Sequence, residues 1–433
     1  MAAGNIDKLY EGALLASLIP GVSLLAGDKN GENFISQAPF LRLNAPYSPT
    51  PLSCIIGNVI YSKSLGKASL QPGRENEPFT AESTICSVAS MSKLMTAVAV
   101  LQAVELGKLD LDENIRPMFP KMGQYGIIRG FDEEQRVGVF ESLDQQTPIT
   151  LRMLLSCTSG HEYDWINANL TKWRASRGEG IWHGVTVEDK SAIPLTFAPG
   201  TGIGYGGGCD WVGKAIEIAF STTLEDFMRE HIWSPLGIQD NMAFFPKTKP
   251  GMKDRFATLS TLTELGEAPA VDEPNFDLLC GGTDDFGASG VCCTPQAYYT
   301  FLSAVFRRDK RLLSAESYTE LFRPQLNEEL EQAFNNYLFL SPAHAQFLAL
   351  GVPREIRKNW SFAGMVCMDA LPGRFEKGTI MWGGVPCCTW FMDFEAGVCG
   401  TAVCQLLPPQ HPVIIEGLHV KFQKGVLEIG KDR

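Results

Sequence analysis

The strongest hydrophobic pattern in this chain is the run at residues 94–101, which reads Leu-Met-Thr-Ala-Val-Ala-Val-Leu. Its length and composition predict an amphipathic helix that begins near Ser90 and ends at Gly107, a residue type that commonly closes helices. A second amphipathic helix is predicted from the N-terminus to Leu18, because Pro20-Gly21 follow at once and would end it.

Short segments rich in valine, isoleucine and aromatic residues predict strands near both ends of the chain. Two of them lie at 20–26 and 54–62, and three more lie at 378–382, 388–393 and 398–406. We expect turns at Gly383-Gly384 and at 395–397 to join the last three strands as antiparallel neighbours. A final helix is predicted at 411–424.

The middle of the chain, residues 110–280, reads as helices broken by many glycines, prolines and polar turns. This order of elements predicts an α+β fold, in which the terminal segments share one antiparallel sheet flanked by helices. Residues 1–110 and 281–433 would form the sheet subdomain, residues 111–280 a mostly helical subdomain, and the active site would lie in the cleft between them. The individual helices are predicted at 150–155, at 210–216, from 224 to just before Pro235, at 294–307 and at 314–323.

Composition narrows the class of protein. The 433 residues are 45% hydrophobic and 20% charged, as in ordinary globular proteins, and the net charge of −12 disfavours nucleic acid and anionic membranes as partners. The N-terminus lacks a basic segment followed by an apolar core, and no stretch is apolar enough to span a bilayer, which predicts a cytoplasmic location. The twelve cysteines are therefore expected to be free thiols. No Cys-x-x-Cys or His-x-x-x-His occurs, so neither metal nor cofactor is predicted.

The most informative motif is Ser90-x-x-Lys93, which places a hydroxyl and an amine one helical turn apart. A desolvated lysine can act as the base that activates a serine nucleophile. About one or two such matches are expected by chance in a chain of this length. A second match, Ser64-x-x-Lys67, follows a predicted strand, where the two side chains would diverge. The alternative for Ser90 and Lys93 is a helix-capping serine with a surface lysine.

A glycine-dense segment at 197–210 surrounds a single tyrosine, Tyr205. Gly202, Gly204 and Gly207 match the G-x-G-x-x-G pattern of dinucleotide-binding proteins, but Pro194 precedes them where that fold needs a buried strand. We favour instead a tight turn that exposes the Tyr205 hydroxyl. An ordinary loop with a packed tyrosine remains the alternative.

Gly383-Gly384 forms a third candidate feature because it lies between two apolar strands. Glycine in a strand often marks the close approach of a ligand, and a simple hairpin bend is the alternative.

Taken together and in this order, Ser90-x-x-Lys93, Tyr205-Gly206-Gly207 and Trp382-Gly383-Gly384 resemble the motifs of the serine β-lactamase and penicillin-binding protein superfamily, in particular its class C branch and the class VIII esterases. Residues 150–160, which read Thr-Leu-Arg-Met-Leu-Leu-Ser-Cys-Thr-Ser-Gly, are similar to a leucine-rich run of that branch, with cysteine in place of its usual histidine. Within the superfamily, the sequence around Tyr205 is most similar to that of fungal side-chain acyltransferases.

The resemblance implies roles for individual residues. Ser90 would be the acylated nucleophile, Lys93 and Tyr205 would share the role of base, and the backbone N–H groups of Ser90 and Val385 would form the oxyanion hole. Substrate would contact the pocket residues Trp382, Gly383, Gly384, Gly207, Trp165 and Tyr163, whose aromatic members are equally good core residues.

Two departures from the family pattern bear on the substrate. Gly207 replaces the usual asparagine of the second motif, and Trp382 replaces the cation of the third, which counts against a β-lactam. The sequence therefore predicts acyl transfer from a small-molecule thioester or ester donor to the hydroxyl of a small natural product, in fungal secondary metabolism. An acyl carrier protein is a candidate partner. Hydrolysis by the same acyl-enzyme and a non-catalytic binding protein are the alternatives.

Overall fold

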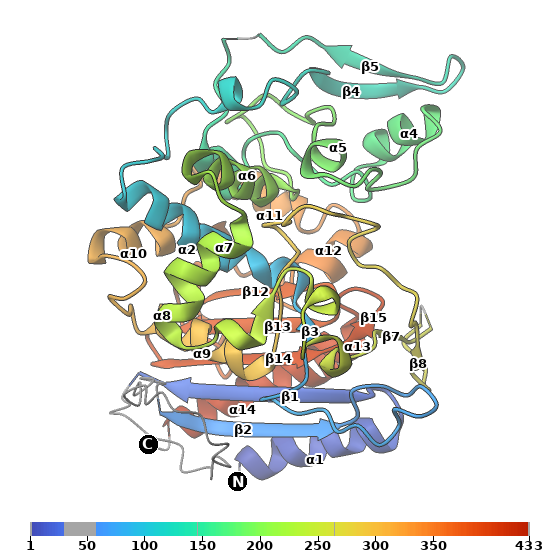
Figure 1. The fold of residues 1–433 in the computed structure, drawn as a ribbon, viewed down its shortest axis with the longest axis vertical. Helices are drawn as coiled ribbons and strands as arrows, with labels where there is room; N and C mark the ends of the chain where they lie inside the picture. Colours follow the sequence, from blue (N-terminus) through green and yellow to red (C-terminus); the bar gives the residue numbers. More distant parts are fainter. Residues whose placement is uncertain (1, 30–57, 145, 264, 432–433) are drawn as a thin grey trace.

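The computed structural model describes residues 2–29, 58–144, 146–263 and 265–431. Its centre is a seven-stranded antiparallel sheet in the order β10-β11-β12-β13-β14-β1-β2 (Figure 1). The predicted α+β fold with an antiparallel sheet flanked by helices is confirmed. The strands are β1 (Gly21–Asp28), β2 (Val59–Gly66), β10 (Lys358–Trp360), β11 (Met365–Cys367), β12 (Ile380–Gly384), β13 (Cys388–Asp393) and β14 (Val398–Cys404).

The two ends of the chain meet within this sheet. Strand β1 pairs with β14 on one side, in the register Val22 opposite Cys404, and with β2 on the other. All eight residues of β1 and all seven of β14 are buried, as expected for strands that are covered on both faces.

Helices cover both faces of the sheet (Figure 1). On one face, α1 (Ala2–Leu15) packs against α14 (Val420–Lys431), and Ile6 and Tyr10 of α1 are buried one helical turn apart. On the other face, α9 (Pro295–Phe306) contacts β1 and β14. Helix α9 begins where Thr294 accepts a hydrogen bond from the N–H of Ala297. None of the described helices is both long and apolar enough to cross a membrane.

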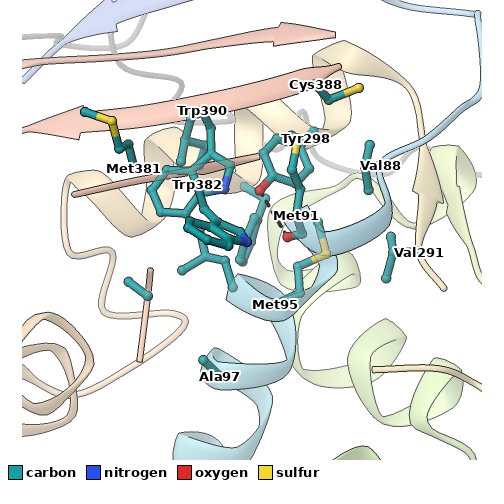
Figure 2. Close-up of a cluster of buried hydrophobic side chains, with 14 of the residues drawn as sticks. Val88, Met91, Met95, Ala97, Val291, Tyr298, Met381, Trp382, Cys388 and Trp390 are labelled. Carbon is teal, nitrogen blue, oxygen red and sulfur yellow. Dashed lines mark hydrogen bonds between the residues drawn. The ribbon is translucent and has the colours of Figure 1, made fainter. Parts of the chain in front are cut away.

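The main hydrophobic core includes the start of α2 (Ser92–Glu105) and the sheet beside it. Figure 2 shows Met91 and Met95 beside Trp382 and Trp390 of the sheet. The Tyr298 hydroxyl of α9 donates a hydrogen bond to the Met91 carbonyl over 3.2 Å. The start of α2 is therefore fixed from below by the sheet and by α9.

A second region, built from the middle of the chain, lies at the far end of the molecule from α1 (Figure 1). A buried ion pair, Arg174 Nε to Asp164 Oδ2 at 2.9 Å, ties its loops together, and Asp164 also accepts the Trp182 N–H. Its elements are β4 (Ile127–Asp132), β5 (Val137–Glu141), α3 (Leu151–Leu155), α4 (Ala168–Ser176), α5 (Val187–Ser191) and α6 (Gly208–Phe220). Helices α7 (Leu224–Met228) and α8 (Ser234–Leu236) lie nearer the middle of the molecule, where α7 contacts α2 (Figure 1).

Short elements complete the fold. Two three-stranded sheets, ordered β3-β9-β6 and β15-β7-β8, connect the two regions. Their strands are β3 (Cys86–Ser87), β6 (Met242–Ala243), β7 (Ser260–Thr261), β8 (Val271–Asp272), β9 (Cys292–Cys293) and β15 (Leu406–Leu407). The remaining helices are α10 (Ala315–Phe322), α11 (Glu328–Tyr337), α12 (Pro342–Leu348) and α13 (Pro412–Ile414).

Several sequence predictions are corrected by the structure. The predicted helix after Ser90 is not amphipathic: α2 is buried on all sides from Ser92 to Ala103 because α6 and α10 cover the flank away from the sheet. The helix predicted to end before Pro235 ends at Leu236 instead: α7 continues through a π-helical turn, Arg229–Trp233, into α8, and Gly237 in the left-handed conformation closes it. The β4–β5 hairpin lies in the region predicted to be mostly helical, and α11 and α12 were not predicted.

Other corrections concern boundaries. Helix α1 ends at Leu15 rather than Leu18, and residues 54–57 of the second predicted strand lie outside the described residues. The predicted turn at Gly383-Gly384 is wrong, because both glycines end β12 and the turn follows them. All eleven described cysteines are free thiols, as predicted.

The position of β12 depends on Gly384. A Cβ atom there would lie 2.2 Å from the carbonyl oxygen of Val88, which is a backbone atom and cannot rotate away. We therefore expect Gly384→Ala to lower the free energy of unfolding by about 2–4 kcal/mol, measured by urea denaturation. Gly12→Ala, on an open helix surface, is the control and should be neutral or stabilising. Equal stability of the two variants would contradict this packing.

Candidate active site

Ser90 lies on a single 3-10 turn, Ala89–Met91, that leads directly into α2. The preceding residue, Ala89, has a φ of 45°, a conformation that residues with side chains rarely adopt. Strain of this kind persists only where surrounding structure enforces it, and Ala89 is fully buried. The turn thus holds the Ser90 side chain in one place, with only 7% of the residue exposed.

Lys93 points back toward Ser90 and is 5% exposed, so the interpretation as a surface lysine is wrong. Its Nζ donates hydrogen bonds to Ser90 Oγ at 3.3 Å, to the Tyr163 hydroxyl at 3.3 Å and to the Ala288 carbonyl at 3.1 Å. The amine has three donors and three uncharged partners, so its position is fully determined.

The charge on Lys93 is coupled to the neighbouring phenols. Burial pulls the pKa of Lys93 down, but its interactions with Tyr163 and Tyr205 outweigh burial, and the net pKa lies above the ordinary value. Burial also raises the pKa of Tyr163, against the opposing effect of Lys93. The charge on Lys93 and the protonation of the Tyr163 phenol therefore influence each other.

Tyr205 comes from the glycine-rich loop before α6 and lies against the same amine. Its ring centroid is 4.7 Å from Lys93 Nζ, and its hydroxyl accepts a hydrogen bond from Trp382 Nε1 at 3.0 Å. The loop is anchored from outside, since the Tyr337 hydroxyl accepts the Tyr205 N–H and donates to Glu162. Segments far apart in sequence thereby bring Ser90, Lys93 and Tyr205 together.

A narrow pocket opens above Ser90, which we call the serine pocket, with a cavity volume of about 10 Å³. Its walls are mostly apolar, and Phe347 and Leu350, from α12 and the residues after it, form one side. Its lining residues are Ser90, Tyr205, Phe347, Leu350, Trp382, Gly383, Val385 and Gln410.

The other predicted pocket residues lie around this space rather than in it. Tyr163 contacts Lys93 from behind, and Trp165 stacks on Tyr163 with ring centroids 5.0 Å apart. Gly384 packs against the backbone of Val88. Gly207 lies at the start of α6 beside Asp210 and Ser191, and lines a different cavity.

Other nucleophiles near Lys93 are unsuited to the role. Burial raises the pKa of both Cys157 and Cys209 to about 12, so their reactive thiolate forms are scarce at neutral pH. His161 hydrogen-bonds Ser159 instead of Ser90, and burial lowers its pKa to about 4. Residues 193–204 form no strand, which removes the context that a dinucleotide-binding loop requires.

Sequence reasoning missed Asp210, which is fully buried beneath the site. Its Oδ1 accepts the N–H of Ala288, the residue whose carbonyl holds Lys93, and its Oδ2 has no partner among the described residues. Burial raises the pKa of Asp210 to about 6, with backbone hydrogen bonding and Lys93 acting against that rise. At neutral pH the site therefore contains a costly negative charge that favours a protonated Lys93.

Phe347, Leu350 and Gln410 were also missed. They lie in segments without a recognisable motif, and only the capping pattern Ser341-Pro342 indicated the helix that carries Phe347. Asp210 stood within the motif around Tyr205, where an acidic residue beside a tryptophan in an apolar helix was a usable signal of a buried charge.

Asp210 should make stability depend on pH. Its pKa of about 6 exceeds the unfolded value near 4, so the folded protein binds the extra proton, and stability falls as pH rises through that window. We expect Asp210→Asn to raise the free energy of unfolding at pH 7.5 by about 1–3 kcal/mol and to change little at pH 4, measured by urea denaturation.

Asp285→Asn is the matched control, because burial also raises the pKa of Asp285 to about 6, while its charged neighbours are Glu217, Glu225 and Lys214 instead of Lys93. Both variants should gain stability, but only Asp210→Asn should change the reactivity of Ser90. A loss of stability in Asp210→Asn at pH 7.5 would mean that its attraction to Lys93 outweighs its burial.

Comparison with known proteins gives a consistent result. ML-236A carboxylate methylbutanoyltransferase of Penicillium citrinum is 31% identical over 98% of this chain and 95% of its own length. Lovastatin esterase of Penicillium rubens is 29% identical over 86% of this chain and 91% of its own. The unliganded structure of simvastatin synthase from Aspergillus terreus superposes with a TM-score of 0.82 at 26% identity, covering 99% of this chain and 98% of the other. The β-lactamase family model matches residues 56–420, and this chain therefore belongs to the β-lactamase family.

Proposed function

We propose that this protein is a serine acyltransferase, which moves an acyl group through an ester on Ser90 to the hydroxyl of a small natural product. The observation that carries the proposal is the Ser90 hydroxyl, held 3.3 Å from the buried amine of Lys93 at the floor of an apolar pocket. Relatives named as methylbutanoyltransferases and acyltransferases, from Penicillium, Aspergillus and Monascus, support the reaction class and a place in fungal secondary metabolism.

In the first half-reaction, Ser90 Oγ attacks the carbonyl carbon of a thioester or ester, and its proton passes to the group formed by Lys93 and Tyr205. The oxyanion would be stabilised by the N–H groups of Ser90 and Val385, where each donor is worth about 2.7–4 kcal/mol. The C–S or C–O bond then breaks, and the leaving group takes the proton. In the second half-reaction the acceptor hydroxyl attacks the Ser90 ester, and the same proton transfers run in the opposite direction.

Whether the acceptor is an alcohol or water depends on the serine pocket. Phe347, Leu350 and Trp382 leave little room for water, and a dry pocket preserves an acyl-enzyme until an alcohol arrives. Hydrolysis by the same intermediate is the second candidate function, favoured by the similarity to lovastatin esterase.

The finer parts of the proposal rest on sequence alone. These are an acyl carrier protein as the bearer of the donor, a cytoplasmic location, and a division into a sheet subdomain and a helical subdomain at residues 111–280. The absence of a β-lactam-binding cation, with Trp382 in its place, supports an apolar acyl substrate.

Acylation of Ser90 can be observed directly. After incubation with a butanoyl thioester and no alcohol, the intact mass should increase by one butanoyl group, and peptide mapping should place that group on Ser90. Ser90→Ala should show no adduct, whereas Ser64→Ala, in the second Ser-x-x-Lys match, should react like the wild type. An adduct that forms equally on Ser90→Ala would refute the assignment, and continuous turnover in water alone would favour the esterase.

The two tyrosines beside Lys93 should contribute unequally. Tyr205 lines the serine pocket and Tyr163 does not, although the Tyr163 hydroxyl accepts a hydrogen bond from Lys93 Nζ. We expect Tyr205→Phe to lower the acylation rate at least about 100-fold, since it removes a proton carrier, and Tyr163→Phe to lower it less than about tenfold. Single-turnover kinetics measures both rates. The reverse order would make Tyr163 the proton carrier.

A further inference from the structure

Gln410 lies where the serine pocket meets a second cavity, and it is 3% exposed. Its Nε2 donates to the Gly384 carbonyl at 2.7 Å and to the Cys388 carbonyl at 3.3 Å. The same amide accounts for the glycine at position 383, because a Cβ atom there would lie 2.6 Å from Gln410 Nε2. The side chain is therefore built into the wall of the serine pocket.

The Gly384 carbonyl and the Val385 N–H belong to one peptide group and point in opposite directions across it. A hydrogen bond from Gln410 to that carbonyl fixes the peptide plane, and so fixes the direction of the Val385 N–H that is proposed for the oxyanion hole. Gln410 Nε2 is thus a positioning group.

The oxygen end of the Gln410 amide, Oε1, has a different environment. Two carbonyl partners assign the NH₂ end of Gln410, which leaves Oε1 as an acceptor turned away from them. Oε1 is buried and has no hydrogen-bond partner among the described residues. A buried acceptor without a partner is costly, so such an atom at a cavity wall indicates a ligand with a donor.

The second cavity, which we call the outer groove, has a volume of about 540 Å³ and lies beside α12. Its walls include Phe339, Ala345, Val352 and Ile415. The serine pocket is too narrow to hold a whole thioester or ester, so part of the donor must lie outside it. Among the described residues, Gln410 alone lines both spaces.

Resting on the proposed function, we propose that the outer groove binds the leaving arm of the acyl donor and that Gln410 Oε1 accepts a hydrogen bond from an amide N–H of that arm. Gln410 then has two separate effects. Its Nε2 supports the oxyanion site for every donor, and its Oε1 selects donors whose arm carries an N–H near the thioester.

Two isosteric donors separate these effects. S-(2-acetamidoethyl) butanethioate carries the N–H, and S-(2-acetoxyethyl) butanethioate has an ester oxygen in its place. The wild type should acylate faster with the amide donor, by about five- to tenfold in kcat/KM. Gln410→Met should reduce this preference to less than about twofold, and should slow both donors by a common factor through loss of the Gly384 hydrogen bond.

Gln239→Met is the matched control, because Gln239 also has a buried oxygen without a partner but lines neither cavity. It should keep the wild-type preference. Thermal melting of both variants checks that they are folded. An unchanged preference in folded Gln410→Met would overturn the role of Oε1, and an unchanged rate with the ester donor would overturn the role of Nε2.

Binding provides a readout that needs no acyl transfer. Ser90→Ala should bind the amide donor more tightly than the ester donor, by calorimetry, and Ser90→Ala/Gln410→Met should bind the two equally. Equal affinities in Ser90→Ala would overturn the inference, even where Ser90 is acylated normally. A preference in binding without any adduct on Ser90 in the wild type would instead refute the proposed function and leave the arm site supported.

Discussion

A buried amine is the constraint on which the rest of this site depends. Lys93 is almost completely removed from water, yet its hydrogen-bond partners are a hydroxyl, a phenol and a backbone carbonyl, none of which carries a full charge. An ammonium group in such a place is tolerated only when nearby groups can share or absorb its proton. The aromatic faces of Tyr163 and Tyr205 and the carboxylate of Asp210 supply that environment, and the proposed acyl transfer would move its protons through the same groups.

The second constraint is steric and lies at the end of β12. Val88, on the serine side, and Gln410, on the opposite side, both occupy space that side chains at 383 and 384 would need. The two glycines let the strand end fit between a strained turn and a buried amide. The peptide that follows them is then held beside Ser90 by the hydrogen bond from Gln410 to the Gly384 carbonyl.

The sequence allowed the fold class and the main strands to be predicted, because β13 and β14 are short apolar segments bounded by clear turns. The order of the three motifs was enough to predict that Ser90, Lys93 and Tyr205 lie together. The residues that line the serine pocket were much harder to predict, since Phe347 and Gln410 lie in segments without a recognisable motif. Their importance comes only from the distant parts of the chain that they contact. Helix α2 illustrates the same limit: its composition indicated a helix, but only its neighbours determine that no face of it meets water.

The pairing of β1 with β14 has a consequence for biosynthesis. Val22 and Cys404 are separated by almost the whole polypeptide, so a chain emerging from the ribosome has no partner for that edge of β1 until synthesis is nearly complete. Strand β12, which carries the glycines beside Ser90, is also made late. The proposed site around Ser90 is therefore completed only when the chain is almost finished.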